Sequence, residues 1–254
     1  MIEIKNLSVS YDYKFSFDLL SDSYHYQYAH NDISLEIPDG QVIGILGENG
    51  AGKTTLLKAL AALTSFKTGE VIYDDSKKLK DMCQKIAFIT EEGSFFPFMT
   101  AKQNAQFLAE FYKKFDMNRF EKLCEFLNLP MNKKARKLSK GQKTKLEIAL
   151  GFSKGAKYLL LDEPFLGNDI FTRRNFLKLM CDSLINDETI IIATHLIDEI
   201  EHFIDRAVLL KDGKIVKDVF IDELQEQQQT LEDLMKEVFH YEEDRFKRIF
   251  ESIN

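Results

Sequence analysis

Short apolar runs, rich in β-branched residues, recur along the chain and alternate with stretches of helical periodicity. Several runs are apolar at consecutive positions, as is typical of strands buried on both faces of a parallel sheet. The clearest runs are VIGILG at 42–47, EVIYD at 70–74, KIAFIT at 85–90, YLLLD at 158–162, TIIIAT at 189–194 and RAVLLK at 206–211. The pattern predicts an α/β fold in which helices cover both faces of a sheet.

One long region contains helical patterns only, from Thr100 to about Lys154, with AQFLAEFYKKF and NRFEKLCEFLNL as its clearest amphipathic stretches. We interpret residues 93–154 as a helical subdomain inserted into an α/β core. The core then comprises residues 1–92 and 155–221.

Residues 222–254 are predicted to form a C-terminal helical extension. Near its end Phe246, Ile249, Phe250 and Ile253 recur at i, i+3, i+4 and i+7, which indicates an amphipathic helix. This helix packs either on its own domain, the simpler interpretation, or on a second copy of the chain.

An aromatic segment near residues 12–30 interrupts the core pattern. Its aromatic residues alternate with other residues on either side of the polar stretch LLSDS, which favours a hairpin with a polar turn. They are Tyr13, Phe15, Phe17, Tyr24, Tyr26 and Tyr28.

Composition narrows the class of protein. The 254 residues are 44% apolar and carry a net charge of −7, which argues against a nucleic-acid-binding protein because duplex binding needs clustered positive charge. Three well-separated cysteines, Cys83, Cys124 and Cys181, indicate a reducing compartment. We see no signal peptide and no apolar run of the ~20 residues that span a bilayer, so work at a membrane would need another chain to provide the span.

The stretch GENGAGKT, residues 47–54, fits G-x-x-x-x-G-K-[ST] and lies between a predicted strand and a predicted helix. Glycines in such a loop let successive backbone N–H groups converge on phosphate oxygens at the positive end of the helix. We expect Lys53 to neutralise the β- and γ-phosphates of ATP and Thr54 to bind Mg²⁺. The predicted nucleotide-binding residues here are Gly47, Glu48, Asn49, Gly50, Ala51, Gly52, Lys53, Thr54 and Thr55.

A second acidic element follows the apolar run YLLL and consists of Asp162, Glu163 and Pro164. A buried strand delivers such carboxylates to the crevice where α/β sheets bind ligands. We expect Asp162 to hold Mg²⁺ through water and Glu163 to act as general base on the attacking water. The alternative is that both acids only cap the next helix.

The polar stretch KLSKGQKTK, residues 137–145, opens the helical pattern LEIALGF. Ser139 and Gln142 have the spacing of a capping box, and the free N–H groups of a helix start attract anions. Its lysines either favour a polyphosphate or are simply exposed helix residues.

These motifs together resemble the ATP-binding cassette family, and the resemblance covers nearly the whole chain. LSKGQ at 138–142 resembles the LSGGQ signature, Thr194-His195 resembles the switch histidine, and Leu166–Asp169 occupies the D-loop position. The resemblance implies a P-loop NTPase with a RecA-like core, an antiparallel β-subdomain and an inserted α-helical subdomain. We assign no role to the other histidines, which are His25, His30, His202 and His240.

The family resemblance also implies how the protein works. Two protomers, identical or different, would bind head to tail around two ATP molecules, with Ser139, Gly141, Gln142 and Asp169 reaching the nucleotide of the partner and His195 the γ-phosphate. The dimer would drive a separately encoded transmembrane permease from the cytoplasmic face of the membrane. The motifs look like those of the export or antimicrobial-resistance branch, with a peptide, drug or lipid-like substrate. The alternative is a cassette ATPase that acts as a nucleotide-gated switch without transport.

The sequence departs from the family pattern at three positions. Lys140 stands where the signature usually has glycine, and Glu91 stands where a metal-binding glutamine is usual. We hypothesise that Glu91 binds Mg²⁺, with Glu92 as the competing assignment. Tyr11 has the place of the aromatic residue that stacks on adenine, although Tyr13 is the alternative because the aromatic segment lengthens this region.

Overall fold

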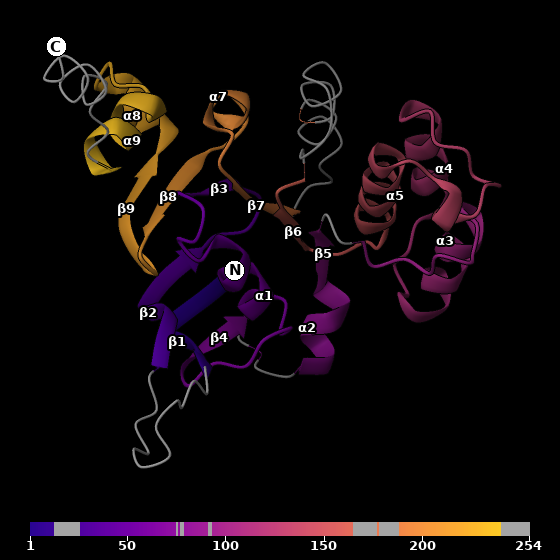
Figure 1. Cartoon of the computed structure of the whole chain (residues 1–254), viewed down its shortest axis with the longest axis horizontal. Helices are drawn as coiled ribbons and strands as arrows, with labels where there is room; N and C mark the ends of the chain where they lie inside the picture. The colour runs from indigo at the N-terminus through magenta and orange to yellow at the C-terminus, as the bar shows by residue number, and fades with distance from the viewer. Residues whose placement is uncertain are drawn as a thin grey trace, which may run out of the picture.

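A computed structural model describes residues 1–12, 26–74, 76, 79–90, 93–164, 177 and 188–239. A six-stranded sheet with the order β5-β6-β7-β3-β8-β9 runs through the middle of the molecule (Figure 1). Its strands are β3 (Val42–Leu46), β5 (Ile86–Thr90), β6 (Tyr158–Asp162), β7 (Thr189–Thr194), β8 (Arg206–Lys211) and β9 (Lys214–Phe220). The first five strands in this order are parallel, and β9 pairs with β8 in an antiparallel hairpin at one edge.

The central strands are buried at every position, as their uninterrupted apolar runs predict. Alternate residues of each strand enter two separate cores. Ile43 and Ile45 face one core with helix α1 (Lys53–Leu60), whereas Val42 and Leu46 face the other with the helices that follow β5. The α/β fold predicted from the sequence is confirmed.

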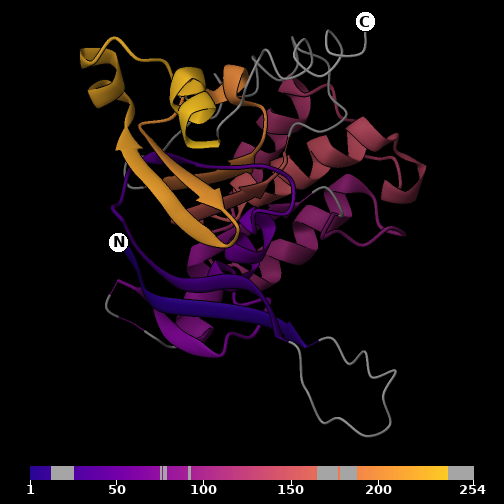
Figure 2. The ribbon, with the colours of Figure 1, turned by 60° about the vertical axis from the view of Figure 1, so that its left-hand side comes forward.

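A second, three-stranded antiparallel sheet covers α1 and one face of the central sheet (Figure 2). Its order is β2-β1-β4, with β1 (Ile2–Asp12), β2 (Tyr26–Ile37) and β4 (Thr68–Tyr73). The run EVIYD therefore belongs to this sheet rather than to the parallel one. The burial pattern of β4 explains why: it is exposed at its start and alternates toward its end. Helix α1 and the antiparallel sheet together cover this face of the central sheet, as the antiparallel β-subdomain implied by the family resemblance predicts.

The predicted aromatic hairpin lies largely outside the described residues. β1 and β2 pair antiparallel as far as Asp12 and Tyr26, so their backbones flank residues 13–25 as the two arms of a hairpin would.

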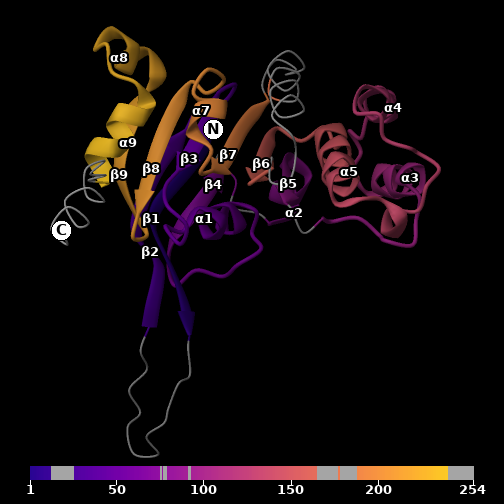
Figure 3. The ribbon, with the colours of Figure 1, turned by 45° about the horizontal axis from the view of Figure 1, so that its top comes forward.

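The helical subdomain lies beyond the β5 edge of the sheet, and the C-terminal helices lie at the β9 edge (Figure 3). Helix α3 begins after the N-cap Thr100, and α4 begins after the N-cap Asp116. The helices are α2 (Leu79–Lys85), α3 (Ala101–Phe111), α4 (Met117–Phe126), the 3-10 turn η1 (Ala135–Lys137), α5 (Lys140–Ser153), α7 (Ile197–Ile200), α8 (Ile221–Glu226) and α9 (Leu231–Phe239). The limits of residues 93–154 as a subdomain stay a prediction, and the predicted helix at 246–253 lies outside the described residues.

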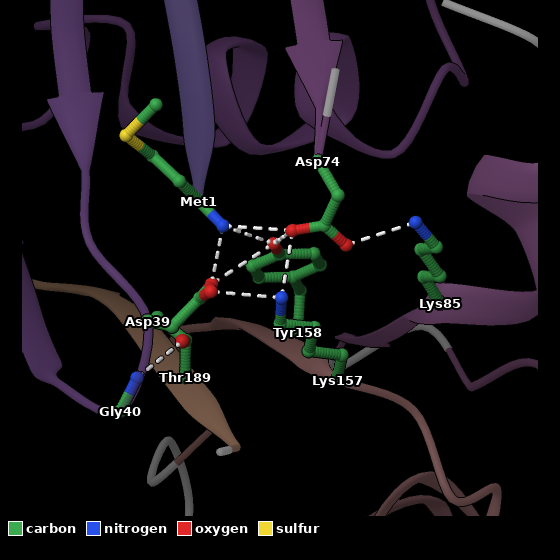
Figure 4. A network of polar contacts seen from close by, with 8 residues as sticks. All are labelled: Met1, Asp39, Gly40, Asp74, Lys85, Lys157, Tyr158 and Thr189. Atoms are coloured by element: carbon green, nitrogen blue, oxygen red, sulfur yellow. Dashed lines mark hydrogen bonds and ion pairs between the residues drawn. The ribbon is translucent and has the colours of Figure 1, made fainter. Parts of the chain in front are cut away.

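A cluster of ion pairs joins the two sheets at the amino ends of the parallel strands (Figure 4). Asp74, just after β4, accepts hydrogen bonds from Lys157 at 2.6 Å and Lys85 at 2.8 Å. The hydroxyl of Tyr158 and the amino group of Met1 also contact this carboxylate, each at 2.8 Å. The cluster therefore links the antiparallel sheet to the start of β6, at the end of the strands opposite the candidate site.

None of the helices in the described part of the chain is long and apolar enough to cross a bilayer.

Candidate nucleotide-binding site

The glycine-rich loop connects the buried strand β3 to α1, as predicted. Gly47 packs so tightly against β8 that an added Cβ atom would lie 2.3 Å from the carbonyl oxygen of Leu210. Gly52 is the N-cap residue of α1 and has φ 105°, a left-handed conformation that favours glycine. These two glycines therefore let the loop curl against the sheet and point the start of α1 into it.

Lys53, the first residue of α1, is almost fully buried, with 6% of its surface exposed. Its Nζ atom donates hydrogen bonds to the carbonyl oxygens of Gly47 at 2.8 Å and Glu48 at 3.2 Å, so the side chain spans the loop. Burial lowers the pKa of Lys53, while the charges of Glu163 and Asp162 oppose that effect. The ammonium group is thus held against the first two residues of the glycine-rich loop.

Two of the three predicted metal ligands, Thr54 and Asp162, contact one another. The hydroxyl of Thr54 donates to Oδ1 of Asp162 at 2.9 Å, at the carboxyl end of β6. Asp162 is 7% exposed, and burial raises the pKa of its carboxyl, partly offset by the Thr54 hydrogen bond. A hydroxyl and a carboxylate oxygen placed side by side fit Mg²⁺, which takes oxygen ligands and usually completes its shell with water and phosphate.

Glu163 follows Asp162 with φ 46°, an unusual conformation for a residue with a side chain. Its N–H donates to the carbonyl oxygen of Ala193, and its Oε1 atom lies 4.0 Å from Nζ of Lys53. The backbone thus turns sharply at the end of β6 and brings the Glu163 carboxylate beside the lysine.

The carboxylate of Glu163 is also held by the end of β7. The hydroxyl of Thr194 donates to Oε2 at 3.0 Å, and Nδ1 of His195 lies 2.9 Å from Oε1. The His195 side chain is 39% exposed, so this contact lies at the solvent-facing side of the site. Glu163 and His195, 32 positions apart in sequence, therefore form one pair because β6 and β7 are neighbours in the sheet.

The signature segment has the predicted capping box. The hydroxyl of Ser139 accepts from the N–H of Gln142 at 3.3 Å, and Oε1 of Gln142 accepts from the N–H of Ser139 at 3.2 Å. Ser139 is exposed, and Gly141 lies in the first turn of α5. Helix α5 packs against β5, away from α1 (Figure 1), so this helix start lies apart from the glycine-rich loop of its own chain.

Several predicted site residues lie outside what the structure describes. They are Glu91, its competitor Glu92, and Asp169 with the rest of the D-loop position. The backbone of Tyr11 is part of β1, but its side chain is also outside the described features.

The sequence analysis missed a histidine at this site. His30, on β2, is fully buried, and its Nε2 atom lies 2.8 Å from the carbonyl oxygen of Gly52. Burial lowers the pKa of His30, against the opposing effect of the backbone groups of Gly52 and Gly213. A single histidine in a strand, 22 positions before Gly52, carries no sequence signal, so only the fold reveals the contact.

A second missed contact links the loop after β5 to the signature helix. Glu147 of α5 is buried, and its carboxylate accepts hydrogen bonds from the N–H of Ser94 at 2.7 Å and from its hydroxyl at 2.6 Å. Burial raises the pKa of Glu147, and these hydrogen bonds oppose the rise. The position of α5 is thereby tied to the segment that leaves the central sheet.

Curated relatives are similar in sequence to this chain over most of its length. The ABC transporter ATP-binding protein YtrB of Bacillus subtilis is 34% identical over 199 residues, which cover 77% of this chain and 68% of YtrB. The SkfA peptide export ATP-binding protein SkfE of the same organism is 28% identical, covering 80% of this chain and 88% of SkfE. The methionine import ATP-binding protein MetN of Protochlamydia amoebophila is 30% identical, and the match covers 86% of this chain and 66% of MetN.

A solved structure and a family model agree with these relatives. One similar solved structure is the dimeric structure of the ATP-binding cassette MJ0796 in a post-hydrolysis state, bound to ADP and phosphate. The match covers 87% of this chain and 99% of the cassette chain, with a TM-score of 0.72 and 24% identity. The two chains therefore share a fold. The model of the ABC transporter family matches residues 30–166, which include the glycine-rich loop, the signature and both carboxylates. This chain belongs to the ABC transporter family, as an ATP-binding subunit that hydrolyses ATP.

Proposed function

We propose that ATP binds between the glycine-rich loop and the carboxyl ends of β6 and β7, and that the residues gathered there hydrolyse it. The observation that carries this proposal is the contact set around Glu163, which joins Lys53, Thr194 and His195 at the end of the sheet. These residues come from three separate segments, and a merely structural turn would need none of them.

Each residue has a task that its position supports. The N–H groups of the loop and the Lys53 ammonium would hold the phosphates, because a helix start and a buried cation both stabilise negative charge. Thr54 and Asp162 would hold Mg²⁺, which would neutralise phosphate charge. Glu163 would accept the proton of the attacking water, and His195 would fix the γ-phosphate and the water in line.

We also propose that two protomers close around two nucleotides. The support is the exposed, capped start of α5, which lies apart from the loop of its own chain, and the dimeric state of the similar cassette structure. Ser139, Gly141 and Gln142 of one protomer would then complete the phosphate site of the other. ATP would favour the closed dimer because it contacts both protomers only in that state.

The dimer would drive a separately encoded membrane permease, to which this chain binds at the cytoplasmic face, and we propose that the substrate is exported. The relatives include both a peptide export protein and a methionine import protein, so the direction rests on the motif pattern. Copurification of the permease, followed by ATP-driven uptake into inverted vesicles, tests the partner and the direction. Uptake into right-side-out vesicles would contradict export.

The Glu163→Gln variant tests the proposed chemistry. We expect ATP turnover to fall by about 100-fold or more, because general base catalysis contributes about that much, while ATP binding remains. Light scattering should show ATP-dependent dimers of this variant, since the closed state no longer turns over.

The matched control is Glu110→Gln, which changes an exposed glutamate on α3. It should hydrolyse ATP at the rate of the unchanged protein. Equal rates for Glu163→Gln and the unchanged protein would remove Glu163 as the base.

A further inference from the structure

We propose that His30 is a positioning residue that aims the first N–H group of α1 at the nucleotide phosphates. The inference rests on the phosphate site proposed above, and it adds a residue of the antiparallel sheet to that site. The geometry of the carbonyl group of Gly52 carries it.

The carbonyl oxygen of Gly52 accepts two hydrogen bonds. One comes from the N–H of Leu56 at 2.9 Å, the first bond of the helix, and the other from Nε2 of His30 at 2.8 Å. Because a carbonyl accepts only, Nε2 carries the proton in this contact. Two donors use both lone pairs of the oxygen and fix the direction of the C=O bond.

The carbonyl of Gly52 and the N–H of Lys53 belong to one planar trans peptide and point in opposite directions. The contact with His30 therefore directs the Lys53 N–H away from β2, toward the interior of the loop. This N–H has no partner inside the helix, because the first four N–H groups of any helix lack one. It is thus a donor held ready for an anion.

The peptide before it is held in the same way by the β8–β9 turn. The N–H of Gly213 donates to the carbonyl oxygen of Ala51 at 3.2 Å, which turns the N–H of Gly52 in the opposite direction. Two successive carbonyls are therefore pinned from outside the loop. The side chain of His30 supplies one of these two contacts, and the backbone of Gly213 supplies the other.

Burying this histidine has a cost in folding free energy, which supports a specific role for its hydrogen bond to Gly52. Its Nδ1 atom is buried and makes no hydrogen bond within the described residues, while the backbone of Gly213 lies near the ring. An unpaired buried acceptor is unfavourable, and an apolar side chain would avoid it. His30 therefore places a donor beside the Gly52 carbonyl that an apolar side chain at this position would not supply.

The test measures ADP binding with Mg²⁺ to the full chain by calorimetry. We expect His30→Leu to weaken binding by about 5- to 10-fold, the effect of losing one hydrogen bond, with no loss of folding stability. His30→Gln should bind almost as the unchanged protein does, because its amide nitrogen reaches about as far as Nε2. His30→Asn is too short to reach and should bind as weakly as His30→Leu, and it replaces the leucine variant if that variant fails to fold.

Two further variants separate a positioning role from other causes. Val9→Ala removes the fully buried neighbour of His30 across β1 and β2, so it should lower stability and leave ADP affinity unchanged. Lys53→Ala should lose nucleotide binding. If Lys53→Ala binds normally, the proposed phosphate site is wrong.

The inference on His30 alone is overturned in either of two cases. One is that Lys53→Ala loses binding while His30→Leu and His30→Asn bind as tightly as the unchanged protein. The other is that His30→Gln binds as weakly as those two variants. In the amide NMR spectrum, the Lys53 signal should shift on ADP binding in the unchanged protein and in His30→Gln, and shift less in His30→Asn.

Discussion

Thr54 shows how one hydroxyl group can serve both the folded protein and its proposed chemistry. In the structure it donates to Asp162 and so satisfies a buried carboxylate. A metal ion bound by both oxygens would take the place of that hydrogen bond. The pair is therefore held close before any ligand arrives, which limits the reorganisation that binding requires.

The Thr54→Ala variant should raise the Mg²⁺ concentration needed for half-maximal ATP binding by roughly 3- to 10-fold, on the order of 1 kcal/mol for one lost polar contact. Thr54→Ser keeps the hydroxyl and should behave as the unchanged protein does. Magnesium titration at fixed ATP gives these values. ADP binding without Mg²⁺ should be equal in all three proteins, and a loss there would show that Thr54 acts only through folding.

Two helices of the helical subdomain begin with a capping box. Thr100 caps α3 with Gln103, and Ser139 caps α5 with Gln142, each through a reciprocal pair of hydrogen bonds. The caps are therefore expected to stabilise the two helix starts to a similar extent. Their difference lies in the proposed use, since only Ser139 belongs to the signature that would meet a second protomer.

Ser139→Ala should abolish ATP-induced dimers in the Glu163→Gln background, measured by light scattering. Thr100→Ala is the matched control, because it removes the same kind of cap from a helix of the same subdomain. Both changes should lower stability by about 1 kcal/mol, but Thr100→Ala should still dimerise. Dimerisation by both variants would refute the role of Ser139.

Across the whole molecule, the candidate nucleotide site and a cluster of stabilising ion pairs lie at opposite ends of the central sheet. The candidate site occupies the carboxyl ends of the parallel strands, and the ion-pair cluster around Asp74 occupies their amino ends (Figure 4). Partial burial alone would raise the pKa of Asp74, but hydrogen bonds from Lys157, Lys85, the amino group of Met1 and Tyr158 outweigh it and hold the pKa well below its usual range.

This depressed pKa predicts a pH dependence of stability. The cluster's contribution is complete above the carboxyl pKa of the unfolded chain, about 3.9, and is lost as the pH falls below that value toward the folded pKa. At pH 7 Asp74→Asn should reduce the free energy of unfolding by about 1 kcal/mol, a partly exposed ion pair being worth little more. The difference from the unchanged protein should shrink between pH 4 and pH 2, roughly the range below that unfolded value.

Denaturant unfolding at several pH values measures this difference. Glu110→Gln, at an exposed position in the last turn of α3, is the control and should change stability little at any pH. A constant difference between Asp74→Asn and the unchanged protein down to pH 2 would contradict the assignment.

Local sequence patterns were enough to predict the central strands, because strands buried on both faces must be apolar at every position, as β3, β6 and β7 are. They were also enough to predict the glycine-rich loop, the carboxylates after β6 and the cap of α5, since each depends on residues close together in the chain.

Contacts between distant segments follow from the packing of the layers and were not predictable from local patterns. Glu163 meets His195 because β6 and β7 are neighbours, and His30 reaches Gly52 because the antiparallel sheet lies over α1. Nor did periodicity place EVIYD in that second sheet, since a strand's partners depend on which surfaces remain to be covered. Local patterns encode burial and turns, whereas the pairing of distant side chains depends on how the layers pack.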